Sequence, residues 1–419
     1  MRQDRDPLVW SILIALAFLA LALHRLATPS AIYFDEVHYV PAARKLLELV
    51  PANREHPMFA KEVIAGAIAL FGDRPLAWRL PAALFGAFGL FAFGRLTWHL
   101  SHRRFAALSA MVLLASGFAW FVQSRIAMLD IFAASLILVG LWQFAAAMRG
   151  VRSGQVRVRL MLAGIATGLA MASKWNVMPI ALLPGLTFAI LRLTGSGKPR
   201  GWSRITLVEA AVWLGIVPLA VYWLSFAPEF LYAARDHPVS PFGFIEQHER
   251  MIALQDSVVK HHTYQSTWRD WVIDRRPIWY LYEQVDGAQR GIIMLGNPLT
   301  MLAGLAALAW CAWAGLVRKR YDALAFAVLY AASLSLWILA PKPVQFYYHY
   351  LLPGTFLLGA LALALDEIRQ KGAMGRWVAW TTLAASLALF GWFYPILSAA
   401  PLADGEFAFA KWMWFGSWR

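Results

Sequence analysis

The feature that most constrains this chain is a series of long apolar stretches. A helix that crosses a membrane needs about twenty mostly apolar residues, and by that measure the sequence predicts about eleven spanning segments. Their approximate ranges are 8–27, 77–98, 105–122, 127–148, 160–173, 176–192, 205–226, 296–317, 323–340, 347–365 and 377–395. Because 60% of the 419 residues are apolar and only 15% are charged, we expect an all-α, polytopic membrane protein forming one domain over residues 1–419.

The distribution of basic residues predicts the orientation in the membrane. The net charge of +14 would suit a nucleic-acid-binding protein if the chain were soluble, but Arg and Lys gather in short links such as HLSHRR, RGVRSGQVRVR and VRKRYD. Basic links between spanning helices face the cytoplasm. With the N-terminus inside, five inner links are all basic, so the charge indicates topology and we expect no nucleic-acid partner.

The opposite side then receives most of the polar residues that could carry chemistry. It holds the first loop (28–76), a long loop (227–295) and an interfacial C-terminal tail (396–419). The orientation follows from the basic links alone, so the position of the candidate residues on one side supports this orientation independently. They are Asp35, Glu36, His56, Lys61, Arg125, Lys174, His261, Lys342 and His349.

Adjacent carboxylates, Asp35 and Glu36, make the first loop the strongest candidate for a catalytic centre. Carboxylates beside a membrane segment are costly and usually have a task. Apolar residues recur at helical spacing after them, which predicts one helix in the membrane interface up to about Val50 and a second over residues 59–71. The alternative interpretation is that the two acids only cap the first of these helices.

Two cations on neighbouring outer links extend this site. Arg125 stands in SRIAMLD and Lys174 in ASKWN, each near the end of a spanning segment. Either could be a helix-end residue that reaches toward water. Together with a carboxylate they suit sugar transfer from a lipid phosphate, since the acid removes a proton and the cations stabilise the departing phosphate.

Further polar and aromatic residues on the outer side are candidates for binding. Lys342 and His349, in PKPVQFYYHYLLP, are expected beside the donor phosphate, although an interfacial aromatic belt also explains the tyrosines there. An acceptor or sugar pocket is expected from His56, Lys61, His261, His262, Tyr264 and Trp268. The alternative is that these six residues serve only to pack the outer loops. There is no HExxH, paired CxxC or glycine-rich phosphate loop, so we expect no metal and no cofactor.

Six motifs in series resemble the protein O-mannosyltransferase family, whose members have the GT-C membrane glycosyltransferase fold. The motifs are FDEVHYVPAARKLL, EHPMFAK, QSRIAMLD, GLAMASKW, HTYQSTWRDWVIDRRPIWYLYE and QFYYHYLLP. The resemblance implies that Asp35 is the catalytic base, that Glu36 helps to position the acceptor, and that Arg125 and Lys174 match the family's functional arginine and its KW lysine. Where the family commonly has HPPLGK this chain has HPMFAK, and residues 227–295 leave no room for the β-trefoil insert of eukaryotic members.

The resemblance also implies a function. A bacterial-type member would be an inverting enzyme of the inner membrane, with its site facing the periplasm or exterior. It would move a hexose, expected to be mannose, from a polyprenyl-phosphate carrier to Ser or Thr hydroxyls of exported proteins. One alternative keeps the chemistry but uses a lipid acceptor, as aminoarabinose–lipid A transferases do. Another is a transporter or flippase, against which stand the one-sided polar residues and the absence of inverted repeats.

Overall fold

The computed structural model describes residues 4–195, 200–202, 204–231, 240–257, 259–340, 342–403 and 405–419. Eight of the helical segments described there are long and apolar enough to cross a membrane. They are α4 (Pro75–Ser101), α7 (Asp130–Ala147), η1 with α9 and α10 (Trp175–Thr194), α11 with η3 and α12 (Leu207–Leu224), α16 (Pro298–Val317), α17 (Tyr321–Leu339), η4 with α18 (Tyr347–Arg369) and α19 (Ala373–Leu397). The expected helical membrane fold is confirmed.

The other three expected spans are also helices, but they do not meet the same criterion. Helices α1 (Leu8–Leu23) and α5 (Arg104–Ala115) are shorter. Helix α8 (Ser153–Met171) begins seven residues before the expected start at 160, because its first turns carry arginines that hydropathy does not count as membrane. The expected 105–122 segment breaks after α5 and continues as α6 (Phe118–Gln123). An exact count of eleven is therefore not confirmed.

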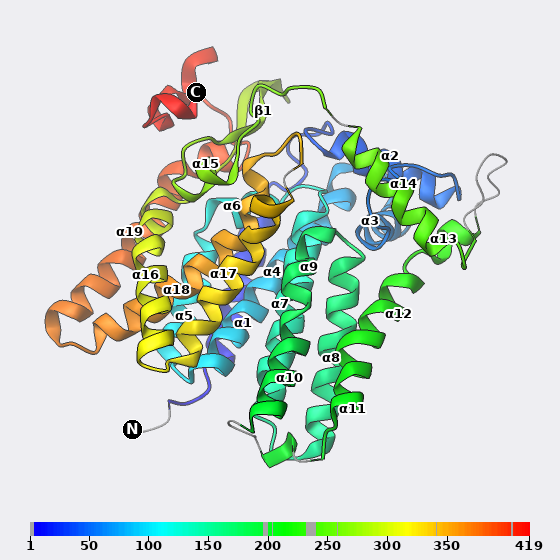
Figure 1. Cartoon of the computed structure of the whole chain (residues 1–419). Coiled ribbons are helices and arrows are strands. Elements are labelled where there is room, and N and C mark those ends of the chain that lie inside the picture. The colour runs from blue at the N-terminus through cyan, green and yellow to red at the C-terminus, as the bar shows by residue number, and fades with distance from the viewer. Residues whose placement is uncertain are drawn as a thin grey trace.

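Helices α7 and α18 form the centre of the bundle, with nearly every residue buried. Close packing in a membrane depends on small residues at helix contacts. Gly164 of α8 illustrates this, because a Cβ atom built there would lie 2.0 Å from the backbone oxygen of Trp213. Figure 1 shows the spans running side by side, with the N-terminus at one end of the bundle and the C-terminus at the other.

The first outer loop folds as the sequence predicts. Helix α2 (Glu36–Leu47) is followed by α3 (Phe59–Phe71), whose bounds match the expected 59–71. The apolar face of α2 is half covered: Val40 and Ala43 are fully buried, whereas Leu47 is 48% exposed. Both helices lie at the end of the bundle that carries the C-terminus (Figure 1).

The long outer loop contains a β-hairpin that the sequence interpretation missed. Three helices precede the hairpin: α13 (Ala227–Phe230), α14 (Phe244–Asp256) and α15 (Trp268–Val272). Strands β1 (Ile278–Val285) and β2 (Ala288–Met294) then pair antiparallel around Asp286 and Gly287, both with positive φ. Asp-Gly between two apolar runs is a strong hairpin signal, so the sequence carried a sign of this short addition to the otherwise helical fold.

The C-terminal tail packs onto the hairpin and α19. It forms two 3₁₀ segments, η5 (Gly405–Trp412) and η6 (Gly416–Trp418). The ring of Phe409 meets that of Tyr282 edge-on at 5.0 Å, and Trp418 is buried with its Nε1 donating to the backbone oxygen of Asp274 at 2.8 Å. The tail therefore covers the outer loop as well as presenting aromatic side chains at its surface.

Candidate active site

Asp35 stands at the N-terminal end of α2 with a free carboxylate. Phe34 before it adopts a positive φ of 48° and stacks on Tyr280 of β1, with ring centroids 4.0 Å apart. This turn starts α2 at Glu36 and leaves Asp35 half-buried. Within the part of the chain that the structure describes, no side chain hydrogen-bonds to the Asp35 carboxylate. Burial raises the pKa of Asp35 to about 6, although nearby Lys174 lowers it.

Glu36 has the opposite environment. Its carboxylate is fully buried and accepts from Arg79 Nε and Nη2 of α4, both at 2.8 Å. It also accepts from the backbone N–H groups of Tyr33 and Ala127, at 3.3 and 3.0 Å. A carboxylate with this many donors is held in place and has little capacity left for a substrate. Glu36 therefore links the first loop to α4 and to the segment before α7.

Lys174 pairs with Asp130, the first residue of α7. The Lys174 Nζ lies 2.8 Å from each Asp130 oxygen, and both side chains are buried. The same ammonium lies 5.0 Å from the ring centroid of Tyr348. Because Lys174 and Asp130 both alter the pKa of Asp35, this ion pair is near the free carboxylate.

Lys342 and His349 are brought to the same region. Lys342 Nζ donates to Gln255 Oε1, and burial together with the charge of Lys174 lowers the pKa of Lys342 to about 8. The buried ring of His349 stacks on Trp337 at 3.9 Å. Its Nδ1 accepts from the Phe346 backbone N–H at 3.2 Å, so the proton of the neutral ring is on Nε2.

His56 also belongs to this cluster, and Lys61 supports the turn that carries His56. Lys61 Nζ donates to the backbone oxygens of Asn53 and His56, at 2.7 and 2.8 Å, and so fixes the turn before α3. Burial lowers the pKa of His56 well below its usual value, and Lys174 and Lys342 lower it further. The His56 imidazole is therefore neutral and lies within the electrostatic influence of two cations, whereas the buried Lys61 side chain donates to backbone oxygens.

Arg125 lies outside this cluster, and its guanidinium is directed at backbone. Nη1 donates to the carbonyls of Ala22 and His24 at 2.6 and 2.8 Å, and Nη2 to those of Arg25 and Ser398 at 3.3 and 3.5 Å. These carbonyls belong to the ends of α1 and α19, where helices leave acceptors unpaired. Its expected contact with the donor phosphate remains a prediction that this geometry does not favour.

The predicted aromatic and histidine residues of the long outer loop lie toward the surface. His261 and His262 are exposed, and Tyr264 and Trp268 are half-buried. His262 is linked to the Lys342 segment through its ring, which meets that of Phe346 edge-on at 5.0 Å. The structure thus leaves this group at the rim of the cluster.

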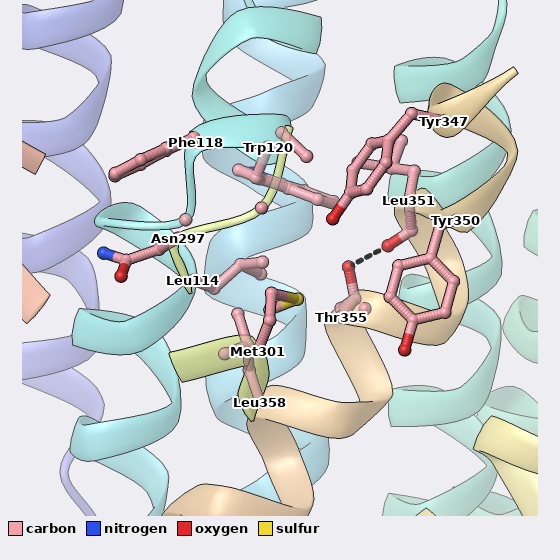
Figure 2. A pocket seen from close by; sticks show the side chains of 14 residues that line it. Leu114, Phe118, Trp120, Asn297, Met301, Tyr347, Tyr350, Leu351, Thr355 and Leu358 are labelled. Carbon is pink, nitrogen blue, oxygen red and sulfur yellow. Dashed lines mark hydrogen bonds between the residues drawn. The ribbon is translucent and has the colours of Figure 1, made fainter. Parts of the chain in front are cut away.

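A small apolar cavity lies next to the cluster, between α6, α16 and α18. It measures about 20 Å³, enough for about one water molecule and too small for a sugar. Figure 2 shows Tyr347, Tyr350 and Thr355 on one side and Phe118 and Trp120 opposite. None of the residues predicted for the site lines this cavity.

Three residues important to this geometry were not singled out from the sequence. Arg79 is one of two arginines inside a spanning segment, the other being Arg95, and a charge there usually marks a function or a partner. Asp130 ends the SRIAMLD motif and begins a helix, and Gln255 carries no distinctive signal. Among the described residues, no group of three or more His, Cys, Asp or Glu side chains is arranged to hold a metal ion.

Two solved structures share the fold of this chain. The Saccharomyces cerevisiae protein O-mannosyltransferase Pmt1–Pmt2 complex bound to the sugar donor matches with a TM-score of 0.85 at 16% identity, over 99% of this chain and 93% of that one. ArnT from Cupriavidus metallidurans bound to undecaprenyl phosphate matches with a TM-score of 0.58 at 17% identity, over 91% and 62%. Both likenesses show the fold, which is the GT-C membrane fold expected from the sequence.

Sequence comparisons give the family. The model for dolichyl-phosphate-mannose-protein mannosyltransferase matches residues 73–233, and that for the C-terminal four-helix membrane region of protein O-mannosyltransferase matches residues 242–418. This chain belongs to the protein O-mannosyltransferase family. Polyprenol-phosphate-mannose–protein mannosyltransferases are similar to it at 26% identity, that of Mycolicibacterium smegmatis over 92% of this chain and 87% of the relative, and that of Corynebacterium glutamicum over 99% and 94%.

Proposed function

We propose that this protein transfers mannose from polyprenyl-phosphate mannose to Ser or Thr hydroxyls of exported proteins, inverting the anomeric centre. The family and its named relatives support the donor and the acceptor class. The observation that carries the mechanism is the contrast between two neighbouring acids: Glu36 is held by Arg79, whereas Asp35 has a free carboxylate near Lys174.

Asp35 is the base in this mechanism. Its carboxylate accepts the proton of the acceptor hydroxyl as the hydroxyl oxygen attacks the anomeric carbon of mannose. The bond from that carbon to the phosphate oxygen breaks, and polyprenyl phosphate leaves with the electron pair. Attack on the face opposite the phosphate inverts the centre, and no covalent sugar intermediate is needed.

The cations act on the departing phosphate. Lys174, Lys342 and the Nε2–H of His349 supply donors that would stabilise the charge that grows on the phosphate in the transition state. His56 and Lys61 form the wall of the sugar or acceptor pocket, with His261, His262, Tyr264 and Trp268 at its rim. Glu36 positions the loop that carries Asp35, and Arg125 supports the site by holding the ends of α1 and α19.

The basic inner links favour a bacterial inner membrane location with the site facing the periplasm or exterior. A transporter interpretation has no support from the comparisons, because the chain belongs to an enzyme family. A lipid acceptor differs from a protein acceptor only in the molecule that brings the hydroxyl to Asp35.

The experiment that tests this function is an assay of purified protein with labelled polyprenyl-phosphate sugars. We expect label from the mannose donor on a Ser/Thr-rich peptide, little from glucose or aminoarabinose donors, and none on lipid A. Label on lipid A with none on the peptide would reverse the acceptor assignment. Analysis of the anomer in the product would test inversion.

A further inference from the structure

Helix α14 crosses the outer end of the bundle with polar side chains directed inward. Gln247 and Met251 are buried and Gln255 is half-buried on its inner face, whereas Ile245 is 76% and Ile252 is 50% exposed. A helix held by burial of apolar residues would show the reverse arrangement. The position of α14 therefore depends on specific hydrogen bonds as well as on the packing of Met251 and Phe244 against the core.

The first half of α14 is bonded to elements near Lys174. His248 Nδ1 donates to the Phe244 backbone oxygen at 2.6 Å, so Nε2 accepts from Tyr222 Oη at 2.6 Å. Tyr222 Oη in turn accepts from Nε1 of Trp175 at 2.8 Å. Since Trp175 follows Lys174 in the chain, this series of bonds fixes α14 relative to that lysine.

The last turn of α14 bonds to two further parts of the site through one side chain. Gln255 Nε2 donates to the backbone oxygen of Glu55 at 2.7 Å, immediately before His56. Gln255 Oε1 accepts from Lys342 Nζ. The amide nitrogen faces an acceptor and the amide oxygen faces a donor, so a single orientation of the amide satisfies both bonds.

The two lysines of the site differ in charge balance. Lys174 is neutralised by Asp130, which lies 2.8 Å away. Lys342 is held by a neutral amide, so its positive charge remains available to an anion. A glutamate at position 255 would still bind the lysine but would neutralise it, and like leucine it would lose the bond to the Glu55 oxygen.

We propose that Gln255 is a positioning residue that holds Lys342 and the turn before His56 while leaving Lys342 charged, so that Lys342 is the principal cation for the donor phosphate. This inference rests on the proposed function, because it concerns the same donor. In this arrangement the uncharged side chain of Gln255 binds the buried Lys342 without cancelling its charge.

Comparison of Gln255→Glu with Gln255→Leu separates this role from a purely structural one. Glutamate keeps a partner for Lys342 but cancels its charge, whereas leucine removes the partner and leaves the charge. We expect the KM for the lipid-phosphate donor to rise on the order of tenfold in Gln255→Glu and less in Gln255→Leu. A structural role predicts the opposite order. Ala253→Glu, on the exposed side of the same helix, controls for the added charge and should leave KM unchanged.

A double substitution tests whether Gln255 acts through Lys342. In a Lys342→Met background, Gln255→Glu should no longer change the KM for the donor or the Kd for farnesyl phosphate, measured in detergent with the full chain. A persistent effect, or equal effects of Gln255→Glu and Ala253→Glu, would overturn the inference while the proposed function stands. Wild-type protein that neither binds farnesyl phosphate nor transfers mannose would instead refute the proposed function itself.

Discussion

Glu36 and Arg79 form a bidentate ion pair in which both side chains are fully buried and both N–O distances are 2.8 Å. The residue before Glu36 is Asp35, whose carboxylate has no hydrogen-bonding side chain among the described residues. The two neighbouring acids therefore differ in their environments. Glu36 holds the loop in place, and the Asp35 carboxylate is free to react.

Loss of either partner of the Glu36–Arg79 pair should reduce stability. Glu36→Gln or Arg79→Met leaves an uncompensated buried charge, which costs about 3–5 kcal/mol, so folded yield and melting temperature in detergent should fall sharply. The matched control is Arg250→Met, which breaks the exposed Arg250–Glu246 pair and should change neither. If Glu36→Gln is as stable as the wild type but inactive, Glu36 has a direct catalytic role.

Asp35→Asn should separate catalysis from folding. The amide keeps the size of the side chain but cannot accept the acceptor's proton, so the variant should fold and bind the donor while transferring almost no sugar. If Asp35 is the base, only its deprotonated form is active in the wild type, and burial raises the pKa of Asp35 to about 6. We therefore expect kcat/KM to be constant above about pH 7 and to fall as the pH drops through 6. A flat profile between pH 5 and 8 would contradict this assignment.

Asp130 and Lys174 should shift this pH profile in opposite directions. Asp130 raises the pKa of Asp35 and Lys174 lowers it. Asp130→Asn should therefore move the acidic limb to lower pH, and Lys174→Met should move it to higher pH. Lys174→Met should also reduce turnover by about 10²–10³, as removal of one donor to a developing negative charge does. If the acidic limb of the pH profile is unshifted in both variants, the Asp130–Lys174 pair does not act on Asp35.

The sequence predicted the elements of this site better than their partners. Hydropathy located the spans, and helical spacing gave α3 its observed bounds, because both depend on local pattern. The ion pair of Arg79 with Glu36 and the bond of Gln255 to Lys342 join residues far apart in the chain, and no local pattern encodes them. Arg125 is a further example. A lone arginine on an outer link suited a phosphate, but its guanidinium donates to backbone oxygens at the ends of α1 and α19.

Arg125→Ala should affect stability at least as much as turnover. The substitution leaves several helix-end carbonyls without their charged donor, at about 1.5–3 kcal/mol for a hydrogen bond to a charged group. We expect a lower melting temperature and folded yield, with the activity lost in proportion to the folded protein. A variant with normal melting behaviour and turnover reduced by 10² or more would instead indicate that Arg125 contacts the donor phosphate.

Topology can be tested with inserted tags. A tag at Gly154 should be cytoplasmic, and tags near Asp256 and at the C-terminus should be outside, because basic links stay inside. A further tag at Gly197, also expected inside, falls outside the described residues. Cytoplasmic labelling at Asp256 would separate the site from exported acceptors and refute the proposed orientation.

The long-range contacts of the first loop and of the link before α7 have a consequence for biosynthesis. Phe34, beside Asp35, stacks on Tyr280, and Arg125 reaches the backbone of Ser398. A nascent chain therefore emerges with Asp35 first, obtains Tyr280 once the hairpin is made, and obtains Ser398 only when the last span leaves the ribosome. We expect the proposed site to be completed in this late step, when the C-terminal helix inserts.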